Sequence, residues 1–240
     1  MKYAVLGDIH GNITALEAVL DNIDKEEVDG VIVLGDILMV GPAPYEVLNK
    51  IKQINPECWI SGNTDLWFDD MKDSSQKTEK EKELYQYYRY AKQKIPEKDV
   101  SDLITLPVQK AININGLDVL CVHGSPRSVV EIMDHRIPYE KLEEIVAGVK
   151  EEIIVCGHSH VPFIGSINGK YVMNTGSVGR SLDGNTSASY GIIEINDHKE
   201  PSFTIKRVKY SLDENLALAK ERDFPNFDKY RRSLVEAKNI

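Results

Sequence analysis

The chain has 240 residues, a length that allows one large domain or two small ones around a sizeable buried core. Hydrophobic residues make up 42% and charged residues 28%, as in ordinary globular proteins. The net charge of -9 repels polyanions and argues against bulk binding to DNA or RNA.

Nothing along the chain resembles a secretion signal or a membrane anchor. The apolar run near Met1 is too short for a signal peptide, and no stretch approaches the roughly 18 apolar residues of a membrane span. Three cysteines, Cys58, Cys121 and Cys156, lie in or beside apolar, strand-like runs. Since free cysteines are usually buried, we expect three reduced thiols in the core of a cytoplasmic protein.

The N-terminal quarter alternates between short apolar runs and amphipathic segments. Three apolar runs predict buried strands: 3–7, 30–34 and 58–60. Helices are predicted between them, after a cap at Asn12 or Thr14 and again over 44–54. Strands that alternate with helices favour a βαβ unit and an α/β layered fold.

Residues 66–106 change character. The stretch from Asp69 to Lys82 is polar and charged, a helix is predicted over 78–95, and a helical turn over 101–106. About 40 residues are too few for an independent core, so we interpret 66–106 as a helical insertion packed beside the rest.

The second half is rich in strands. Two hairpins are predicted around Asn115-Gly116 and Asn168-Gly169, which are typical of type I′ turns. The other predicted elements are a helix over 138–149, a strand over 153–156 and a strand pair over 190–195 and 202–210. We expect a single domain over 1–210 and a helical extension over 211–240.

Five apolar runs each end, within one to three residues, in a side chain that can bind a metal ion. The segments are Gly7-Asp8-Ile9-His10, Gly35-Asp36, Gly62-Asn63, His123-Gly124 and Gly157-His158-Ser159-His160. In open α/β sheets, ligands bind at the carboxyl ends of the strands. We therefore expect seven side chains to converge there: Asp8, His10, Asp36, Asn63, His123, His158 and His160.

Each of these residues alone has a simpler explanation. Asp8 and Asp36 could cap helices, Asn63 could occupy a turn, and His123 could be a half-buried histidine. The pair His158 and His160, directly after a buried strand and a glycine, is much harder to explain as packing. The joint pattern favours a metal site.

The kinds of ligand restrict the metal. Imidazoles mixed with carboxylates and an amide favour Mn, Fe, Zn, Ni or Co over Mg or Ca, which prefer oxygen alone. Seven protein ligands are too many for one such ion with an open position. Two divalent ions that share a bridging carboxylate account for them.

These five segments, in this order, resemble the calcineurin-like metallophosphoesterase superfamily. Asn174-Thr175-Gly176-Ser177 is also similar to its Asn-Pro-Gly-Ser segment, and the resemblance covers about 1–210. It looks closest to small bacterial and archaeal phosphodiesterase-like members. The Gly-Ser-Pro after His123 and the Ser-Val-Gly-Arg after Gly176 point to a diadenosine tetraphosphatase-like branch.

The resemblance implies a four-layer α/β/β/α sandwich, in which two sheets pack face to face with helices outside. It assigns Asp8, His10 and His160 to the first metal. It assigns Asn63, His123 and His158 to the second, with Asp36 bridging both. The expected reaction is attack of a metal-bridging hydroxide on a phosphodiester or a nucleotide phosphoanhydride.

Among the site residues, we expect Asp36, Asn63, His123 and Arg180 to take part in catalysis. Arg180 and Arg127 are the basic residues nearest the motifs, so either could bind phosphate; each could equally be a solvated surface arginine. We expect a small phosphorylated substrate, nucleotides included, no membrane partner, and a monomer or homo-oligomer.

The chain departs from the family at Thr64, where many members carry a histidine thought to protonate the leaving group. Asp65, the next residue of that motif, is retained. Because a threonine cannot act as an acid near pH 7, the substitution favours leaving groups of low pKa. His135 is a candidate replacement acid, although a loop histidine is usually only a surface residue.

Two further hypotheses remain open from the sequence. The enzyme could be a phosphomonoesterase or protein phosphatase, or the fold could serve as a non-catalytic metal-binding scaffold. The insertion also offers Trp67, Tyr85 and Tyr88 as candidates for stacking on a nucleobase, against their default role in packing.

Overall fold

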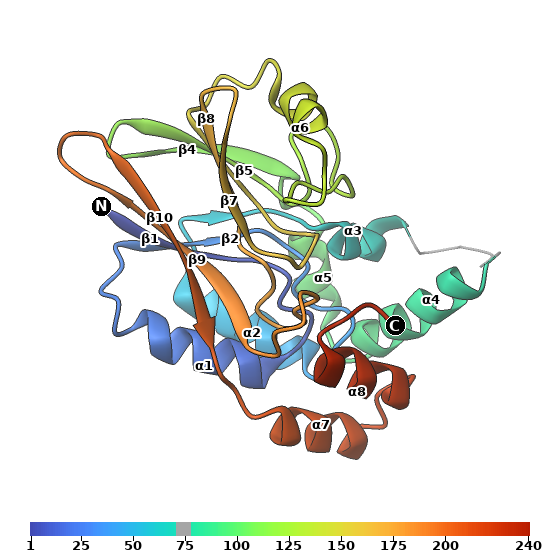
Figure 1. Cartoon of the computed structure of the whole chain (residues 1–240). Coiled ribbons are helices and arrows are strands. Elements are labelled where there is room, and N and C mark those ends of the chain that lie inside the picture. Colours follow the sequence, from blue (N-terminus) through green and yellow to red (C-terminus); the bar gives the residue numbers. More distant parts are fainter. Residues whose placement is uncertain (71–77) are drawn as a thin grey trace.

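The computed structural model of the protein describes residues 1–70 and 78–240. Two five-stranded sheets lie face to face, with helices against both outer faces (Figure 1). The layers therefore run helix, sheet, sheet, helix, which confirms the predicted α/β/β/α sandwich.

The first sheet has the strand order β10-β9-β1-β2-β3. Its strands are β1 (Lys2–Leu6), β2 (Gly30–Val33), β3 (Cys58–Trp59), β9 (Ala188–Ile195) and β10 (Pro201–Val208). Strands β1, β2 and β3 are parallel to one another, as βαβ connections through α1 (Ile13–Ile23) and α2 (Pro44–Ile54) require. Asn12 caps α1, accepting a hydrogen bond from the Ala15 amide at 3.1 Å.

The second sheet has the order β4-β5-β6-β8-β7. Its strands are β4 (Gln109–Ile114), β5 (Leu117–Val122), β6 (Ile153–Cys156), β7 (Phe163–Ile167) and β8 (Lys170–Asn174). Both predicted Asn-Gly turns are confirmed, because both residues of each turn have positive φ. Helix α6 (Tyr139–Val146) covers the outer face and ends before residue 149, where the sequence pattern predicted its end.

Alternation along the central strands creates the layers. In β1, Ala4 and Leu6 face the helices, whereas Tyr3 and Val5 face the second sheet. Strands β5 and β6 divide their side chains in the same way between the inter-sheet core and α6. These runs are continuously apolar because both faces of each strand are buried.

The insertion and the C-terminal extension pack on the same core as α1 and α2. Their helices are α3 (Asn63–Asp70), α4 (Glu79–Lys92), α5 (Glu97–Leu103), α7 (Leu212–Glu221) and α8 (Phe227–Glu236). Tyr87 of α4 stacks on Phe224, which lies between α7 and α8, with ring centroids 5.4 Å apart. This contact joins two segments that are far apart in the sequence.

The insertion departs from the sequence prediction at two helices. Helix α3 was not predicted, and α5 begins at Glu97, directly after Pro96, rather than at residue 101. Proline disrupts the interior of a helix but is well suited to a helix start, so Pro96 separates α4 from α5. The predicted polar stretch of the insertion at 71–77 lies outside the described residues.

No helix within the described ranges is long and apolar enough to cross a membrane. Cys58, Cys121 and Cys156 are free and buried, as predicted. The cytoplasmic compartment stays a prediction.

Candidate metal centre

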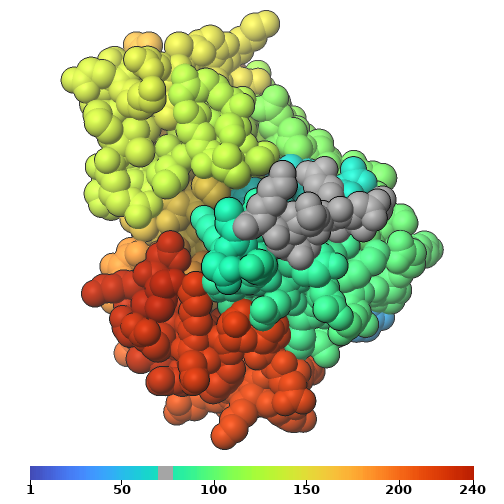
Figure 2. Space-filling view, turned by 90° about the vertical axis from the view of Figure 1, so that its right-hand side faces the viewer, coloured from blue at the N-terminus to red at the C-terminus, as the bar shows by residue number. Residues whose placement is uncertain are grey.

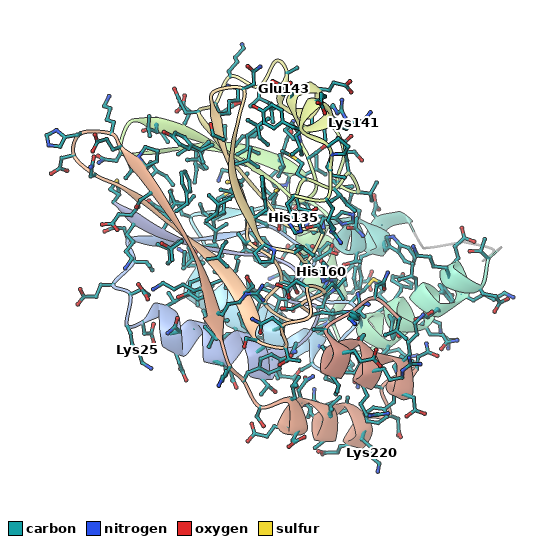
Figure 3. All side chains as sticks on the ribbon, in the orientation of Figure 1. Lys25, His135, Lys141, Glu143, His160 and Lys220 are labelled. Carbon is teal, nitrogen blue, oxygen red and sulfur yellow. The ribbon has the colours of Figure 1, made fainter. Side chains whose placement is uncertain are left out.

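The residues predicted from the five segments lie where strands of both sheets end. Asp8 and His10 follow β1, Asp36 follows β2, and Asn63 begins α3 after the short loop that follows β3. His123 follows β5, and His158 and His160 follow β6. The central position of His160 is visible in Figure 3.

The first cluster consists of Asp8, His10 and His160, all buried. The Nε2 atoms of His10 and His160 are 3.1 Å apart. Asp8 Oδ1 lies 3.2 Å from His160 Nε2 and 3.7 Å from His10 Nε2. These are the three side chains that the resemblance assigns to the first metal.

The second cluster consists of Asp8, Asp36 and His123. His123 Nε2 lies 3.6 Å from Asp36 Oδ1 and 3.0 Å from Asn63 Oδ1. Asp36 Oδ2 faces the first cluster, 3.7 Å from His10 Nε2. The two oxygens of Asp36 thus point at different clusters, an arrangement suited to a bridging carboxylate.

The second cluster differs from the implied division in one respect. Asp8 borders both clusters, since its Oδ1 also lies 4.0 Å from His123 Nε2. His158 belongs to neither cluster of the described residues, although its ring centroid is 5.3 Å from that of His123. Its backbone amide instead donates to Asp8 Oδ2 at 2.8 Å and so orients that carboxylate.

Backbone carbonyls fix the tautomers of three histidines. The Nδ1 atoms of His10, His123 and His160 lie 2.9, 2.8 and 2.5 Å from the carbonyl oxygens of Met39, Leu34 and Arg180. A carbonyl oxygen can only accept, so each Nδ1 carries its proton. In the neutral imidazole, each Nε2 then offers a lone pair to the cluster, as metal-binding histidines do.

The charge balance of the centre calls for cations. Asp8 Oδ1 is buried without a hydrogen-bond partner within the described residues. Although burial opposes their ionisation, the surrounding imidazoles hold the pKa of Asp8 and of Asp36 well below the usual range. Burial lowers the pKa of His160, which favours its neutral, ligating form. Two carboxylates and inward-facing lone pairs fit divalent metal ions.

The ligand loops adopt an unusual backbone. Five of the candidate ligands have positive φ: Asp8, His10, Asp36, His158 and His160. This region is sparsely populated and costs on the order of 1 kcal/mol or more per residue, which the surrounding fold must offset. Such outliers gather at functional sites, so the loops are shaped for ligand placement rather than for local stability.

Two glycines and the carboxylate of Asp65 pack against these loops. A Cβ on Gly62 would collide with the Asp36 carboxylate, and one on Gly157 would lie 2.5 Å from Asp8 Oδ2. Asp65 accepts hydrogen bonds from the backbone amides of Asp36 and Gly62 at 2.7 and 2.9 Å. Burial and the Asp36 charge raise the pKa of Asp65 to about 6.

A cavity of about 810 Å³ opens over the clusters. Ligand side chains form its inner part, and residues of α4 and α8 form its outer part. Figure 2 shows these two helices side by side on one face of the molecule. Arg180 lies on the cavity wall between the two parts.

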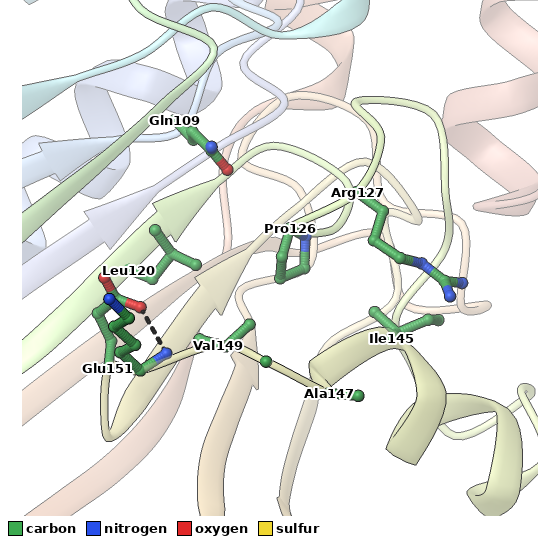
Figure 4. A pocket seen from close by; sticks show the side chains of 10 residues that line it. Gln109, Leu120, Pro126, Arg127, Ile145, Ala147, Val149 and Glu151 are labelled. Carbon is green, nitrogen blue, oxygen red and sulfur yellow. Dashed lines mark hydrogen bonds between the residues drawn. The ribbon is translucent and has the colours of Figure 1, made fainter.

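Several other predicted contributors lie elsewhere. Arg127 lines a separate hollow, beside Pro126 and Ile145 (Figure 4). It forms an ion pair with Glu131. His135 is exposed and does not line the cavity over the clusters. Trp67, Tyr85 and Tyr88 pack in or against the core instead of lining this cavity. Tyr87 and Tyr230, which the sequence did not single out, do line it.

Comparison with known proteins identifies the family of this chain. The profile of the calcineurin-like phosphoesterase superfamily domain matches residues 1–198. The chain belongs to the calcineurin-like phosphoesterase superfamily. An uncharacterised protein of Methanocaldococcus jannaschii, MJ0912, is 30% identical over 233 residues, which cover 87% of this chain and 88% of that protein.

Two crystal structures of similar proteins have the same fold. A metallophosphoesterase from Sphaerobacter thermophilus matches with a TM-score of 0.79 and 25% identity over 99% of both chains. The hypothetical protein PH1004 from Pyrococcus horikoshii matches with a TM-score of 0.83 and 21% identity over 100% of this chain and 99% of that one. The buried Asp/His clusters therefore correspond to a metal site typical of the calcineurin-like phosphoesterases.

Proposed function

We propose that the protein is a phosphoesterase that uses two divalent metal ions to hydrolyse a phosphodiester or a nucleotide phosphoanhydride. One observation carries this proposal: a buried set of candidate metal ligands shares one cavity with Arg180, which forms no ion pair among the described residues. The bound ions, drawn from Mn, Fe, Zn, Ni or Co, would supply an activated water and neutralise charge on the phosphoryl group. We also propose that the protein falls in the branch of small phosphodiesterase-like or diadenosine tetraphosphatase-like members.

Arg180 is suited to bind the substrate phosphate. Its Nε atom is buried and has no hydrogen-bond partner in the part of the chain that the structure describes. Burial lowers the pKa of the guanidinium, because the charged form loses solvation by water. A phosphate in the cavity would supply the missing negative charge through charge-assisted hydrogen bonds.

Asn63 is placed to act beside the reacting group, and His123 lies buried behind it. The Asn63 amide lines the cavity with its Oδ1 directed at His123 Nε2, so its amide nitrogen is left for a phosphoryl oxygen. Burial lowers the pKa of His123, but the Asp36 and Asp8 carboxylates outweigh it and raise the pKa to about 10. The same two carboxylates that raise the pKa of His123 would also attract a metal ion.

Thr64 favours substrates with good leaving groups. Its side chain lines the cavity, and its hydroxyl is buried without a hydrogen-bond partner among the described residues. Its backbone amide donates to Asp36 Oδ1 at 2.8 Å, a role that any residue except proline could fill. Without a general acid here, an anhydride or an activated diester suits the site better than an alkyl phosphate.

The experiment is hydrolysis of bis-p-nitrophenyl phosphate with added Mn²⁺, comparing the wild type with Asp36→Asn. We expect metal-dependent turnover that falls by at least about a hundredfold in the variant, because even outer-shell metal partners are worth 10–100-fold. A panel of diesters, monoesters and dinucleotide polyphosphates would then rank the substrates. Metal-independent turnover, or none over the whole panel, would refute the proposal and favour a non-catalytic scaffold.

A further inference from the structure

The C-terminal segment enters the cavity and contacts Arg180. Asn239 Oδ1 accepts a hydrogen bond from Arg180 Nη2 at 3.3 Å, and Asn239 lines the cavity. The amide of Gly184, four residues after Arg180, donates to the Ala237 carbonyl at 3.0 Å. The segment is thus attached to the same loop that carries the arginine.

The surroundings of Arg180 differ from those of the other arginines. Five arginines pair with carboxylates: Arg127, Arg136, Arg207, Arg222 and Arg232. Arg89 and Arg231 are exposed. Arg180 alone, within the described ranges, is half-buried, with its Nε atom fully buried, and is held by a neutral amide oxygen. A neutral acceptor orients a guanidinium without cancelling its charge.

The backbone of Arg180 is already fixed by the metal-binding loops. Its carbonyl lies 2.5 Å from His160 Nδ1, and its amide donates to Ser177 Oγ at 2.8 Å. The Ser177 hydroxyl in turn donates to the carbonyl of Asp8 at 2.7 Å. The long side chain of Arg180 is held less firmly than its backbone, since among the described residues its one hydrogen bond is to Asn239.

The helix before Asn239 is anchored across the cavity. Lys229 of α8 pairs with Glu83 of α4 at 2.7 Å, and Asn226 donates to Gln86 at 3.1 Å. Tyr230 and Ser233 of α8 line the cavity wall. The end of the chain is therefore positioned from two sides, by α4 and by the loop of Arg180.

We propose that Asn239 is a positioning residue, which aims the Arg180 guanidinium at the substrate phosphate without neutralising it. This inference rests on the proposed function, since it assumes that Arg180 binds phosphate. It makes the C-terminal extension a functional wall of the substrate site.

Two substitutions at Asn239 separate positioning from a structural role. Asn239→Ala removes the hydrogen bond, whereas Asn239→Asp keeps an acceptor but adds a negative charge beside Arg180. We expect Asn239→Ala to weaken binding of inorganic phosphate to the Mn²⁺-loaded protein by about fivefold, the scale of one ordinary hydrogen bond. Asn239→Asp should weaken it further, by about tenfold or more, because its carboxylate competes with phosphate for the guanidinium.

The readouts are phosphate affinity by calorimetry, manganese content, and the separate values of KM and kcat for bis-p-nitrophenyl phosphate. We expect a raised KM, a smaller change in kcat and unchanged manganese content. Asn239→Gln, which retains a neutral amide, should recover part of the affinity. Val235→Ala, an exposed apolar position on α8 that does not line the cavity, serves as the matched control and should match the wild type.

The outcomes distinguish this inference from the proposed function. Wild-type phosphate affinity in both Asn239→Ala and Asn239→Asp would overturn the inference even if the enzyme turns over. So would an Asn239→Asp variant that matches the wild type while Asn239→Ala is weak, because that result would show a purely structural hydrogen bond. A wild-type protein that binds phosphate but hydrolyses nothing would refute the proposed function, while the phosphate affinities would still decide the role of Asn239.

Discussion

The inner and outer halves of the cavity are built in opposite ways. The inner half consists of short loops at strand ends, with five candidate ligands in left-handed backbone conformations and glycines packed against carboxylates. The outer half consists of regular helices, α4 and α8, joined by side-chain contacts such as the ion pair of Lys229 and Glu83. Strained loops thus hold the candidate metal ligands in place, whereas the surfaces of two helices shape the opening of the cavity above them.

The largest expected effect comes from filling space in the inner half. In Gly62→Ala, the new methyl group would collide with the Asp36 carboxylate and its backbone amide. We expect loss of bound metal and a fall in kcat/KM of about a hundredfold or more, beyond the usual effect of outer-shell changes. Metal analysis and kinetics on the purified variant measure both.

Gly148→Ala is the matched control for Gly62→Ala. Gly148 also has a positive φ, but nothing lies within 4 Å of an added Cβ. It should lower the free energy of unfolding by about 1 kcal/mol through backbone strain and leave metal content intact. A Gly62→Ala protein that keeps its full metal content would show that the inner half is far more adaptable than its geometry indicates.

The next effect lies at the junction of the two halves. Arg180→Ala should lower kcat/KM by about 10²-fold, the scale of removing one preorganised donor to a developing charge. Because Arg180 holds His160 through its backbone carbonyl, the variant should retain its metal. Arg127→Ala is the control and should stay within about twofold of the wild type, since Arg127 lies in another hollow and a surface ion pair contributes little. Equal losses in the two variants would contradict the placement of the phosphate.

The inner half was largely predictable from the sequence. Buried parallel strands read as continuous apolar runs, and the residues after them had to meet at one edge of the sheets. That reasoning, together with the family resemblance, named Asp8, His10 and His160, which the structure gathers in one cluster. The left-handed backbone of the candidate ligands could not be predicted, because tertiary contacts rather than local propensity impose it. The residues with positive φ are Asp8, His10, Asp36, His158 and His160.

The outer half was not predictable in the same way. Its contacts join positions that are more than a hundred residues apart, such as Glu83 with Lys229 and Gln86 with Asn226. Helical periodicity shows which face of a helix is apolar but not which partner covers it. The sequence therefore placed stacking candidates at Tyr85 and Tyr88, whereas Tyr87 of the same helix lines the cavity. Asn239 carried no local signal, since a lone asparagine near a helix end is usually a surface residue.

The smallest expected effect tests the outer half itself. Glu83 Oε2 accepts from Lys229 Nζ at 2.7 Å, and the Tyr87 hydroxyl donates to Glu83 Oε1 at 3.2 Å. The Lys229 side chain is 42% exposed, so solvent screens this pair. We expect Glu83→Gln to lower the free energy of unfolding by less than about 1 kcal/mol and to change KM by less than about threefold, with metal content unchanged.

Glu79→Gln on the same helix sharpens this last test. Glu79 also lines the cavity, but it pairs with Lys82 on its own helix and its side chain is 90% exposed. Both substitutions remove one negative charge from the cavity, so a shared rise in phosphate affinity reports that charge alone. A decrease in thermal stability seen only for Glu83→Gln isolates the contact between α4 and α8. If Glu83→Gln instead released metal, the two halves of the cavity would be energetically coupled. The metal centre would then depend on the contact between α4 and α8.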